Sequence, residues 1–244
     1  MRRFGLIGYP LGHSFSRKYF SDKFANEGIS GCEYQLFPIE NIELLPGLLE
    51  NYPDLEGLNV TIPYKKDVLS YLTDTSKLPA GLNACNCIRI KDGQLTGFNT
   101  DVTGFRLSIS GMLKPHHKHA LILGNGGATA AVKYALAELG LHYSVVSRRR
   151  SVDVDLIYED IDEAIMSKYS VIINTTPLGT IPDVHLAPEI PYDLLTPDHL
   201  LYDLVYNPEV TTFMKQGQLS GASVKNGYDM LVIQAEESWK IWNS

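Results

Sequence analysis

The chain has 244 residues, a formal net charge of -7 and 44% hydrophobic residues, enough for one large domain or two of moderate size. The acidic balance argues against a protein whose main partner is nucleic acid or an anionic membrane, because both require a broad basic surface. The apolar stretch near the start, residues 4–8, is too short for a signal-peptide core or a membrane span.

Cysteine usage indicates a reducing compartment. There are three cysteines, and Cys85 and Cys87 are separated by a single residue, which is neither a disulfide framework nor the usual zinc or redox spacing. We therefore expect a cytoplasmic protein with neither nucleic-acid nor membrane partners, and either a monomer or a homodimer stays open.

The first hundred residues alternate between strand and helix patterns. Apolar and β-branched runs predict strands at 4–8, 33–39 and 58–63, and helical spacing predicts helices at 16–28, 42–52 and 65–72. Two further strand-like runs flank Asp92-Gly93, a dipeptide that favours a tight hairpin turn.

A second alternation begins after the polar segment at 115–119. It predicts a strand at 119–123, a helix at 128–140, a strand at 142–147, two more strands near Val171 and Leu201, and a final helix at 226–242. We therefore expect an α/β protein of two domains. Residues 1–101 would form an N-terminal α/β domain to which the C-terminal helix, within 226–244, returns, and residues 102–225 a Rossmann-type nucleotide-binding domain.

A glycine-rich loop marks the start of the second domain. An apolar strand runs into Gly124, Asn125, Gly126, Gly127 and Ala128, and a helix of good formers follows. Glycines there let the backbone approach a diphosphate, and the free amides at a helix start attract its charge. Strand-to-helix turns also use glycine for other reasons, but the flanking strand and helix favour a dinucleotide site. Thr129 departs from the usual pattern, which has a third glycine.

The next strand ends in a basic cluster, Ser147, Arg148, Arg149 and Arg150. NAD-binding domains place an acid near this point for the ribose hydroxyls, whereas guanidinium groups suit a ribose 2′-phosphate. The position therefore favours NADP(H), with Arg148 and Arg149 as candidates, over an ordinary solvated charge run.

Three histidines, His116, His117 and His119, form the densest histidine cluster. They have no carboxylate companion and no metal-site spacing, so we expect a solvated linker and no metal.

Eight motifs, taken in order, resemble those of the shikimate dehydrogenase family. They span nearly the whole chain: HSFS at 13–16, NVTIPYK at 59–65, ACN at 84–86, NTDVTG at 99–104, GNGGA at 124–128, NTTPLG at 174–179, DLVYNP at 203–208 and MLVIQA at 230–235.

The resemblance implies a reversible, NADP-dependent reduction of 3-dehydroshikimate to shikimate. Hydride transfer to a ketone leaves an alkoxide, so a proton donor must lie within hydrogen-bond reach. Lys65 matches the family's catalytic lysine, and Asp101 matches the aspartate that orients it. Most lysines are simply surface residues, and we expect that for the neighbouring Lys66.

The resemblance also implies substrate contacts. Ser14 and Ser16 match a carboxylate-binding pair, and Tyr206 matches a tyrosine near the same carboxylate. The polar contacts to the ring match Thr61, Asn86 and Gln234. Each has an ordinary alternative: Ser16 as a helix cap, Asn86 as a turn residue and Gln234 as an exposed helix position. Phe15 and Arg17 depart from the family pattern.

On the cofactor side, the resemblance places Thr175, Thr176 and Pro177 near the nicotinamide and Val205 at the wall of the same pocket, and Gly227 is a further candidate for cofactor binding. Three rival functions remain open. The first is a quinate/shikimate dehydrogenase of relaxed specificity, because quinate has an extra hydroxyl and the two substrates differ by one polar contact. The second is a methylene-tetrahydrofolate dehydrogenase, whose bulky aromatic substrate needs a larger pocket. The third is a non-catalytic NADP sensor, which would be expected to lack the lysine–aspartate pair.

Overall fold

The protein is described from a computed structural model that covers residues 1–12 and 14–244. The chain divides into two compact units, residues 1–103 with 231–244, and residues 104–230. Within the described residues, no helix has the length and apolar character needed to cross a membrane.

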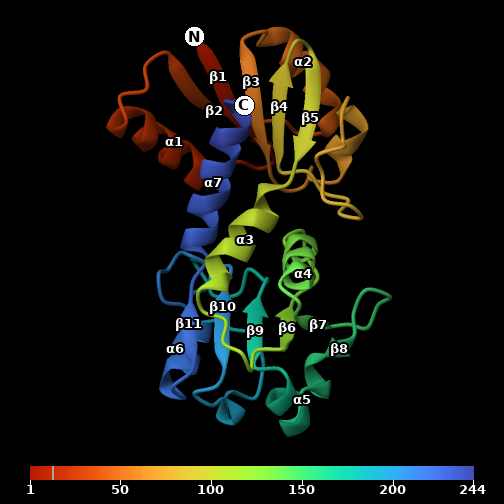
Figure 1. Cartoon of the computed structure of the whole chain (residues 1–244), viewed down its shortest axis with the longest axis vertical. Helices are drawn as coiled ribbons and strands as arrows, with labels where there is room; N and C mark the ends of the chain where they lie inside the picture. The colour runs from red at the N-terminus through yellow and green to blue at the C-terminus, as the bar shows by residue number, and fades with distance from the viewer. Residues whose placement is uncertain (13) are drawn as a thin grey trace. The chain divides into compact units, whose positions relative to one another are not determined.

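The first unit is built on a five-stranded sheet with the order β2-β1-β3-β4-β5 (Figure 1). β1 pairs in parallel with β2 and β3, whereas β3, β4 and β5 pair antiparallel. The strands are β1 (Arg2–Gly8), β2 (Cys32–Pro38), β3 (Leu55–Val60), β4 (Cys87–Lys91) and β5 (Gln94–Phe98). The predicted hairpin turn is confirmed: Asp92 and Gly93 both have positive φ, at 51° and 75°.

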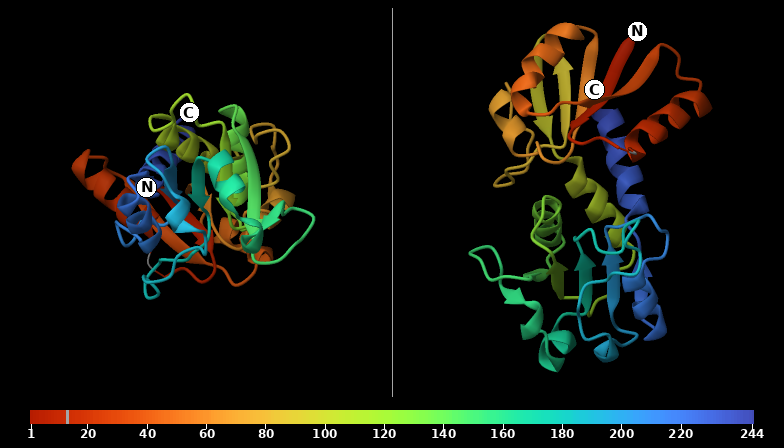
Figure 2. Two further views of the ribbon diagram at one scale, coloured as in Figure 1. Left: turned by 90° about the horizontal axis from the view of Figure 1, so that it is seen from below. Right: turned by 180° about the vertical axis from the view of Figure 1, so that it is seen from behind.

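Helices cover both faces of this sheet, because side chains alternate between the faces of a strand. Figure 2 shows α2 (Leu45–Asn51) on one face of this sheet and α1 (Phe15–Asn26) and α7 (Tyr228–Trp242) on the other. In β1, Phe4 and Leu6 pack with α1 and α7, whereas Ile7 packs with α2 and its surroundings. Three short elements complete the unit: η1 (Ile42–Leu44), η2 (Asp67–Tyr71) and the start of α3 (Thr100–Ser110). Pro46 lies in the first turn of α2, where a missing amide hydrogen costs nothing.

The C-terminal helix α7 packs against the first unit at two places along its length. The Trp242 ring stacks on Phe4 with 4.9 Å between centroids, and its indole nitrogen donates to the Ile88 carbonyl at 3.0 Å. Nearer the middle of α7, the Lys23 ammonium of α1 donates to Glu236 at 2.8 Å, and the Tyr19 hydroxyl donates to the same carboxylate. The last helix is thus an integral part of the unit formed by the first hundred residues.

The second unit has a six-stranded, wholly parallel sheet with the order β11-β10-β9-β6-β7-β8. Counted from β6, this is the order 3-2-1-4-5-6 of a dinucleotide-binding Rossmann fold. The strands are β6 (His119–Leu123), β7 (His142–Ser147), β8 (Leu156–Ile157), β9 (Val171–Asn174), β10 (Leu200–Asp203) and β11 (Ser223–Lys225). The predicted α/β class with a Rossmann-type half is confirmed.

Helices lie on both faces of the second sheet. Leu121, Ile172 and Leu201 point to the face covered by α5 (Glu163–Lys168), η4 (Tyr192–Leu194) and α6 (Thr212–Leu219). On the other face, Phe105 of α3 meets Tyr202 edge-on at 5.0 Å, and α4 (Thr129–Glu138) buries Val132. The turn η3 (Tyr158–Asp160) follows β8.

Two expectations about local structure were incomplete or wrong. Helix α3 was not anticipated, because Phe105, Leu107 and Ile109 alternate as in a strand; in the structure Phe105 and Ile109 are buried and Leu107 is half exposed. The expected solvated histidine linker is wrong for His117. That ring is buried, and its Nδ1 accepts from the Lys114 amide at 3.0 Å.

The approach of Trp242 to β3 leads to a stability prediction. A Cβ at Gly57 would lie 2.3 Å from the Trp242 indole nitrogen, so Gly57→Ala must push the buried ring away. We expect a loss of about 1–3 kcal/mol in the free energy of unfolding, measured by urea titration. Gly47→Ala in α2 is the matched control, because no atom lies within 4 Å of the added carbon. Equal stability of the two variants would contradict the proposed tight packing.

Candidate active site

A cavity of about 310 Å³ opens at the carboxyl ends of β1 and β3 in the first unit. Its lining combines polar and ionisable side chains with a few apolar ones from β1, β3, α1 and α7. Among the lining residues are seven of the predicted site residues, Ser14, Ser16, Thr61, Lys65, Asn86, Asp101 and Gln234. Residues more than two hundred positions apart in sequence thus meet around one small space.

Lys65 and Asp101 form an ion pair at this cavity. The Lys65 ammonium donates to the Asp101 carboxylate at 2.6 Å, and both side chains are largely buried, with 20% and 13% exposed. The two charges compensate each other in this partly desolvated place. Lys66, in contrast, is exposed at the start of η2, as expected for a surface lysine.

Local hydrogen bonds hold the backbones of this pair. The Lys65 carbonyl accepts from the Cys85 amide at 2.8 Å, which fixes the turn after β3. The Asn99 side chain accepts from the Val102 amide at 3.2 Å and donates to the Ala84 carbonyl at 2.9 Å. Asn99 thereby caps α3 and places Asp101 in its first turn.

Asn86 and Gln234 are more buried than an ordinary turn residue and an exposed helix position would be. Asn86 is 2% exposed, and its side chain accepts from the Thr100 amide at 2.6 Å and donates to the Thr100 hydroxyl at 3.0 Å. Gln234 is 6% exposed, so the alternative of an exposed helix position is wrong; its amide donates to the Leu231 carbonyl at 2.9 Å. Within the described residues, the second N–H hydrogen of each amide has no acceptor and is available to a ligand.

The two serines have different local roles. Ser14, not Ser16, caps α1, because its hydroxyl accepts from the Arg17 amide at 3.3 Å. The alternative of Ser16 as the cap is therefore wrong. Ser16 hydrogen-bonds the buried Tyr34 hydroxyl, whose pKa is raised by burial, so Tyr34 stays neutral. Arg17 is exposed and does not line the cavity.

A buried polar chain lies beneath the cavity. The Tyr34 hydroxyl donates to Asn59 at 2.9 Å, and the Asn59 amide donates to the Ser238 hydroxyl at 2.9 Å. The Ser238 hydroxyl in turn contacts the Gln234 carbonyl at 2.9 Å. The sequence reasoning gave these three residues no role, although an asparagine inside an apolar strand such as LNV is a visible signal.

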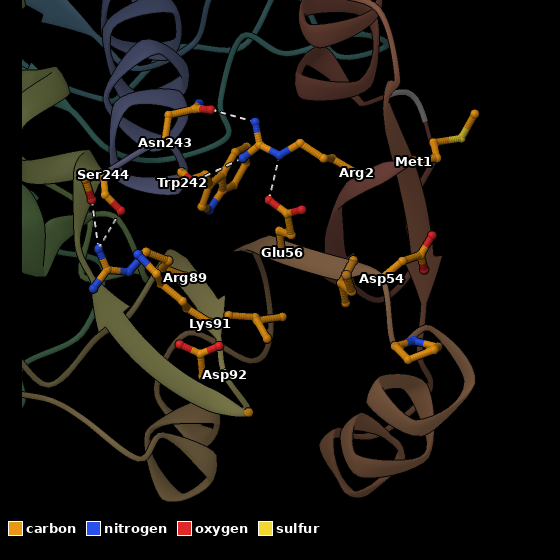
Figure 3. Close-up of a pocket in the computed structure, with 14 residues that line it drawn as sticks. Met1, Arg2, Asp54, Glu56, Arg89, Lys91, Asp92, Trp242, Asn243 and Ser244 are labelled. Atoms are coloured by element: carbon orange, nitrogen blue, oxygen red, sulfur yellow. Dashed lines mark hydrogen bonds and ion pairs between the residues drawn. The ribbon is translucent and has the colours of Figure 1, made fainter.

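A larger cavity of about 670 Å³ lies at the amino ends of β1 and β3 (Figure 3). Part of its charged lining is paired within the protein: Arg2 contacts Glu56 at 2.6 Å and Asn243 at 2.8 Å, and Arg89 contacts the Ser244 hydroxyl at 2.8 Å. None of the predicted site residues lines it. The smaller cavity is therefore the better candidate for the substrate.

In the second unit, the glycine loop joins β6 to α4 as the sequence predicts. Gly124 has φ of 108°, and a Cβ there would lie 2.8 Å from the Thr175 hydroxyl. Asn125, Gly126 and Gly127 are exposed, and Ala128 caps α4 without a side-chain hydrogen bond. The first amides of α4 thus have no side-chain acceptor from the cap, as a helix start that binds phosphate requires.

Thr129, in place of the third glycine, has a clear local role. Its hydroxyl donates to the Gly124 carbonyl at 3.1 Å and lies 3.0 Å from the Thr175 hydroxyl. This contact joins the glycine loop to the end of β9. The strand order reverses between β6 and β9, and in open α/β sheets ligands bind at such a point.

The basic cluster after β7 divides into two kinds of arginine. Arg150 forms a two-point ion pair with Asp160, at 2.8 and 3.0 Å. Arg148 and Arg149 are exposed, and across residues 1–12 and 14–244 neither has a hydrogen bond or ion pair with another side chain. Ser147 ends β7 directly before them. Two guanidinium groups are thus left for an external anion.

The remaining predicted cofactor residues follow β9 and β10. Thr175, Thr176 and Pro177 come directly after β9, and Val205 comes two residues after the end of β10. The Gly227 amide donates to the Val205 carbonyl at 3.2 Å. Tyr206, predicted near the substrate, is half-buried in this second unit and is not among the residues that line the 310 Å³ cavity.

Two fully buried polar residues, Asn174 and Asp203, connect these two loops, and the sequence reasoning assigned neither a role. The Asn174 amide donates to the Asp203 carboxylate at 2.9 Å. Burial raises the pKa of Asp203 to about 6, although hydrogen bonds from Thr211, Val205 and Asn174 act in the opposite direction.

This shift predicts a pH dependence of stability. Because the folded-state pKa of Asp203 lies above its ordinary value of 3.8, its contribution to stability is present below about pH 4 and is lost as the pH rises through 6. Relative to Asp203→Asn, the wild-type free energy of unfolding should fall by about 2 kcal/mol between pH 4.5 and 7.5. Urea titrations of both proteins at each pH measure the difference, and a constant difference would contradict the shift.

Comparisons with known proteins agree with this geometry. Residues 6–88 match the family model of the shikimate dehydrogenase substrate binding domain. A shikimate dehydrogenase (NADP(+)) from Clostridium beijerinckii is 38% identical over 254 residues, covering 99% of this chain and 92% of its own.

Solved structures are similar over the whole chain. A chorismate mutase/shikimate 5-dehydrogenase fusion protein from Clostridium acetobutylicum has 33% identity and a TM-score of 0.87, covering 99% of this chain and 90% of its own. Shikimate 5-dehydrogenase from Thermus thermophilus, in complex with NADP(H) and shikimate, has 28% identity and a TM-score of 0.85, with coverage of 99% and 93%. The similarity in sequence and in fold extends over both units, and the chain belongs to the shikimate dehydrogenase family.

Proposed function

We propose that this protein catalyses the reversible, NADP-dependent reduction of 3-dehydroshikimate to shikimate, a step in aromatic amino-acid biosynthesis. The observation that carries the proposal is the Lys65–Asp101 pair, joined at 2.6 Å beside a small polar cavity. NADPH supplies the hydride when it is bound. The residues of this chain hold the substrate and move the proton.

Lys65 is the proposed proton donor. Reduction of the ketone makes its oxygen an alkoxide, and the Lys65 ammonium at the cavity wall gives that oxygen a proton. In the oxidation of shikimate, the same amine takes the proton from the hydroxyl. Asp101 accepts a hydrogen bond from Lys65 and so holds the amine in place, and it orients a substrate hydroxyl.

The polar lining suits a small hydroxylated acid. Ser14 and Ser16 are proposed to hold the substrate carboxylate, with Tyr206 as a further contact. Thr61, Asn86 and Gln234 are proposed to bind the ring oxygens. Each of Asn86 and Gln234 uses one amide hydrogen within the protein, and across residues 1–12 and 14–244 the other has no acceptor, which supports this role.

The second unit is proposed to bind NADP, and residues 1–101 with the C-terminal helix to bind the substrate. The residues present fit the cofactor: the loop from Gly124 to Ala128 offers exposed backbone beside a helix start without a side-chain cap. Ser147, Arg148 and Arg149 are proposed to bind the 2′-phosphate. The set Thr175, Thr176, Pro177, Val205 and Gly227 is proposed to lie near the nicotinamide.

We also propose that the enzyme works in the cytoplasm, as a monomer or homodimer. Its three cysteines are free thiols, which suits a reducing compartment. A dehydrogenase that also accepts quinate is the second candidate, because quinate differs by one hydroxyl at the carbon that bears the carboxylate. A non-catalytic NADP sensor is disfavoured by the intact Lys65–Asp101 pair.

The substrate choice is tested by following NADPH absorbance with shikimate plus NADP, and in parallel with quinate and with NAD. We expect turnover of shikimate with NADP to be fastest. Turnover of quinate alone would change the substrate and keep the chemistry, whereas no turnover with either acid would overturn the proposed reaction.

Loss of the proton donor should abolish turnover selectively. We expect Lys65→Ala to lower kcat by about 10²–10⁴-fold, the usual contribution of general acid–base catalysis, with the fold and NADP binding retained. Asp101→Asn should also lower kcat strongly. Lys66→Ala is the matched control, since this neighbouring lysine is exposed, and its kcat should remain near the wild-type value. Equal rates in Lys65→Ala and Lys66→Ala would reject the role of Lys65.

The arginines after β7 should set the cofactor preference. We expect the double variant Arg148→Ala/Arg149→Ala to raise KM for NADPH about tenfold or more, and to leave KM for NADH almost unchanged, because only NADPH carries the 2′-phosphate. Arg150→Ala is the control, since its guanidinium is engaged by Asp160. Equal losses for the two cofactors would exclude a 2′-phosphate site here.

A further inference from the structure

Asp203 is a fully buried carboxylate to which the proposed chemistry gives no task. It ends β10, and its two oxygens accept hydrogen bonds from three different segments. A buried charge without a cationic partner is costly, so its retention in this place requires an explanation.

The first segment is the loop after β10. The Val205 amide donates to Asp203 Oδ1 at 3.0 Å, which turns the chain sharply as the strand ends. Val205 itself is buried. The course of this loop therefore depends on an acceptor at the position of Oδ1.

The second segment is the loop after β9, reached through Asn174. The Asn174 Oδ1 accepts from the Thr176 amide at 3.0 Å and from the Thr176 hydroxyl at 2.6 Å. These two donors fix which end of the Asn174 amide is oxygen, so its nitrogen must face Asp203, to which it donates at 2.9 Å. Asp203 thus supports Thr176 through one intermediate residue.

The third segment is the start of α6. The Thr211 hydroxyl donates to Asp203 Oδ2 at 2.6 Å and accepts from the Met214 amide at 3.3 Å as the helix cap. Thr211 therefore shares the carboxylate with the two loops but contacts neither Val205 nor Thr176 by a hydrogen bond within the described residues.

We propose that Asp203 is a positioning residue for the cofactor site, which holds the loop after β9 and the loop after β10 in one fixed arrangement through Asn174 and the Val205 amide. The inference rests on the proposed function, which assigns Thr176 and Val205 to the nicotinamide side. Asp203 acts through its neighbours and does not itself contact the cofactor.

The geometry predicts different effects for two substitutions of Asp203. In Asp203→Asn, the side-chain oxygen can remain at Oδ1 and still accept from Asn174 and Val205, while the new NH₂ group faces Thr211, whose hydroxyl can turn to accept. In Asp203→Ala both acceptors are lost: the Val205 amide is left buried without its acceptor, and the Asn174 amide keeps only its 3.5 Å contact with the Leu178 carbonyl. The asparagine variant should therefore rescue what the alanine variant loses.

The test measures the dissociation constant of NADP by calorimetry, together with KM and kcat for both substrates. We expect Asp203→Ala to weaken NADP binding and raise its KM about tenfold or more, with little change in KM for shikimate. Asp203→Asn should stay within about twofold of the wild type. Thr211→Val is the control for stability alone, because it removes the third donor and the helix cap yet leaves both loops anchored.

If Asp203→Ala fails to fold, Asn174→Asp serves in its place, because it sets two carboxylates against each other and should weaken NADP binding similarly. Unchanged NADP binding in the folded loss variant, or equal weakening in Thr211→Val and Asp203→Ala, would overturn the positioning role. Calorimetry needs no turnover, so a wild type that binds NADP without oxidising shikimate would refute the proposed reaction and still leave this role testable.

Discussion

Parallel pairing brings the carboxyl ends of neighbouring strands to one edge of a sheet, and the candidate sites of this chain follow from that constraint. In the first unit, Thr61 and Lys65 follow β3, whose parallel neighbour β1 ends at the same cavity. In the second unit, the glycine loop and the basic cluster follow the adjacent strands β6 and β7. Each sheet therefore brings together, at one edge, polar groups that are distant in sequence.

The features that could be predicted are those that depend on short stretches of neighbouring residues. The glycine loop lies between an apolar strand and a helix, and the Asp92-Gly93 turn has the backbone angles that this dipeptide favours. Seven of the eight residues proposed for catalysis and substrate binding line one cavity. They could be named from the sequence because the motifs that carry them, taken in order, are specific to one family. Tyr206 belongs to the other unit, so this cavity does not test its role.

Features that depend on partners far along the chain could not be predicted. The Asn59 amide meets Ser238, which lies 179 positions away. Short elements such as α5 and β11 carry too few residues for a periodic pattern, so packing against the sheet, and not propensity, determines them.

The return of α7 to the first sheet has a consequence for how the chain is made. Residues 104–230 form one continuous segment and can acquire their fold as soon as they leave the ribosome, whereas the first unit lacks one of its covering helices until residues 231–244 arrive. Until then the aromatic face around Phe4 and Phe20 has no partner from α7. The unit that contains residues 1–103 is thus completed after the second unit, and the long sequence separation of these contacts slows its folding.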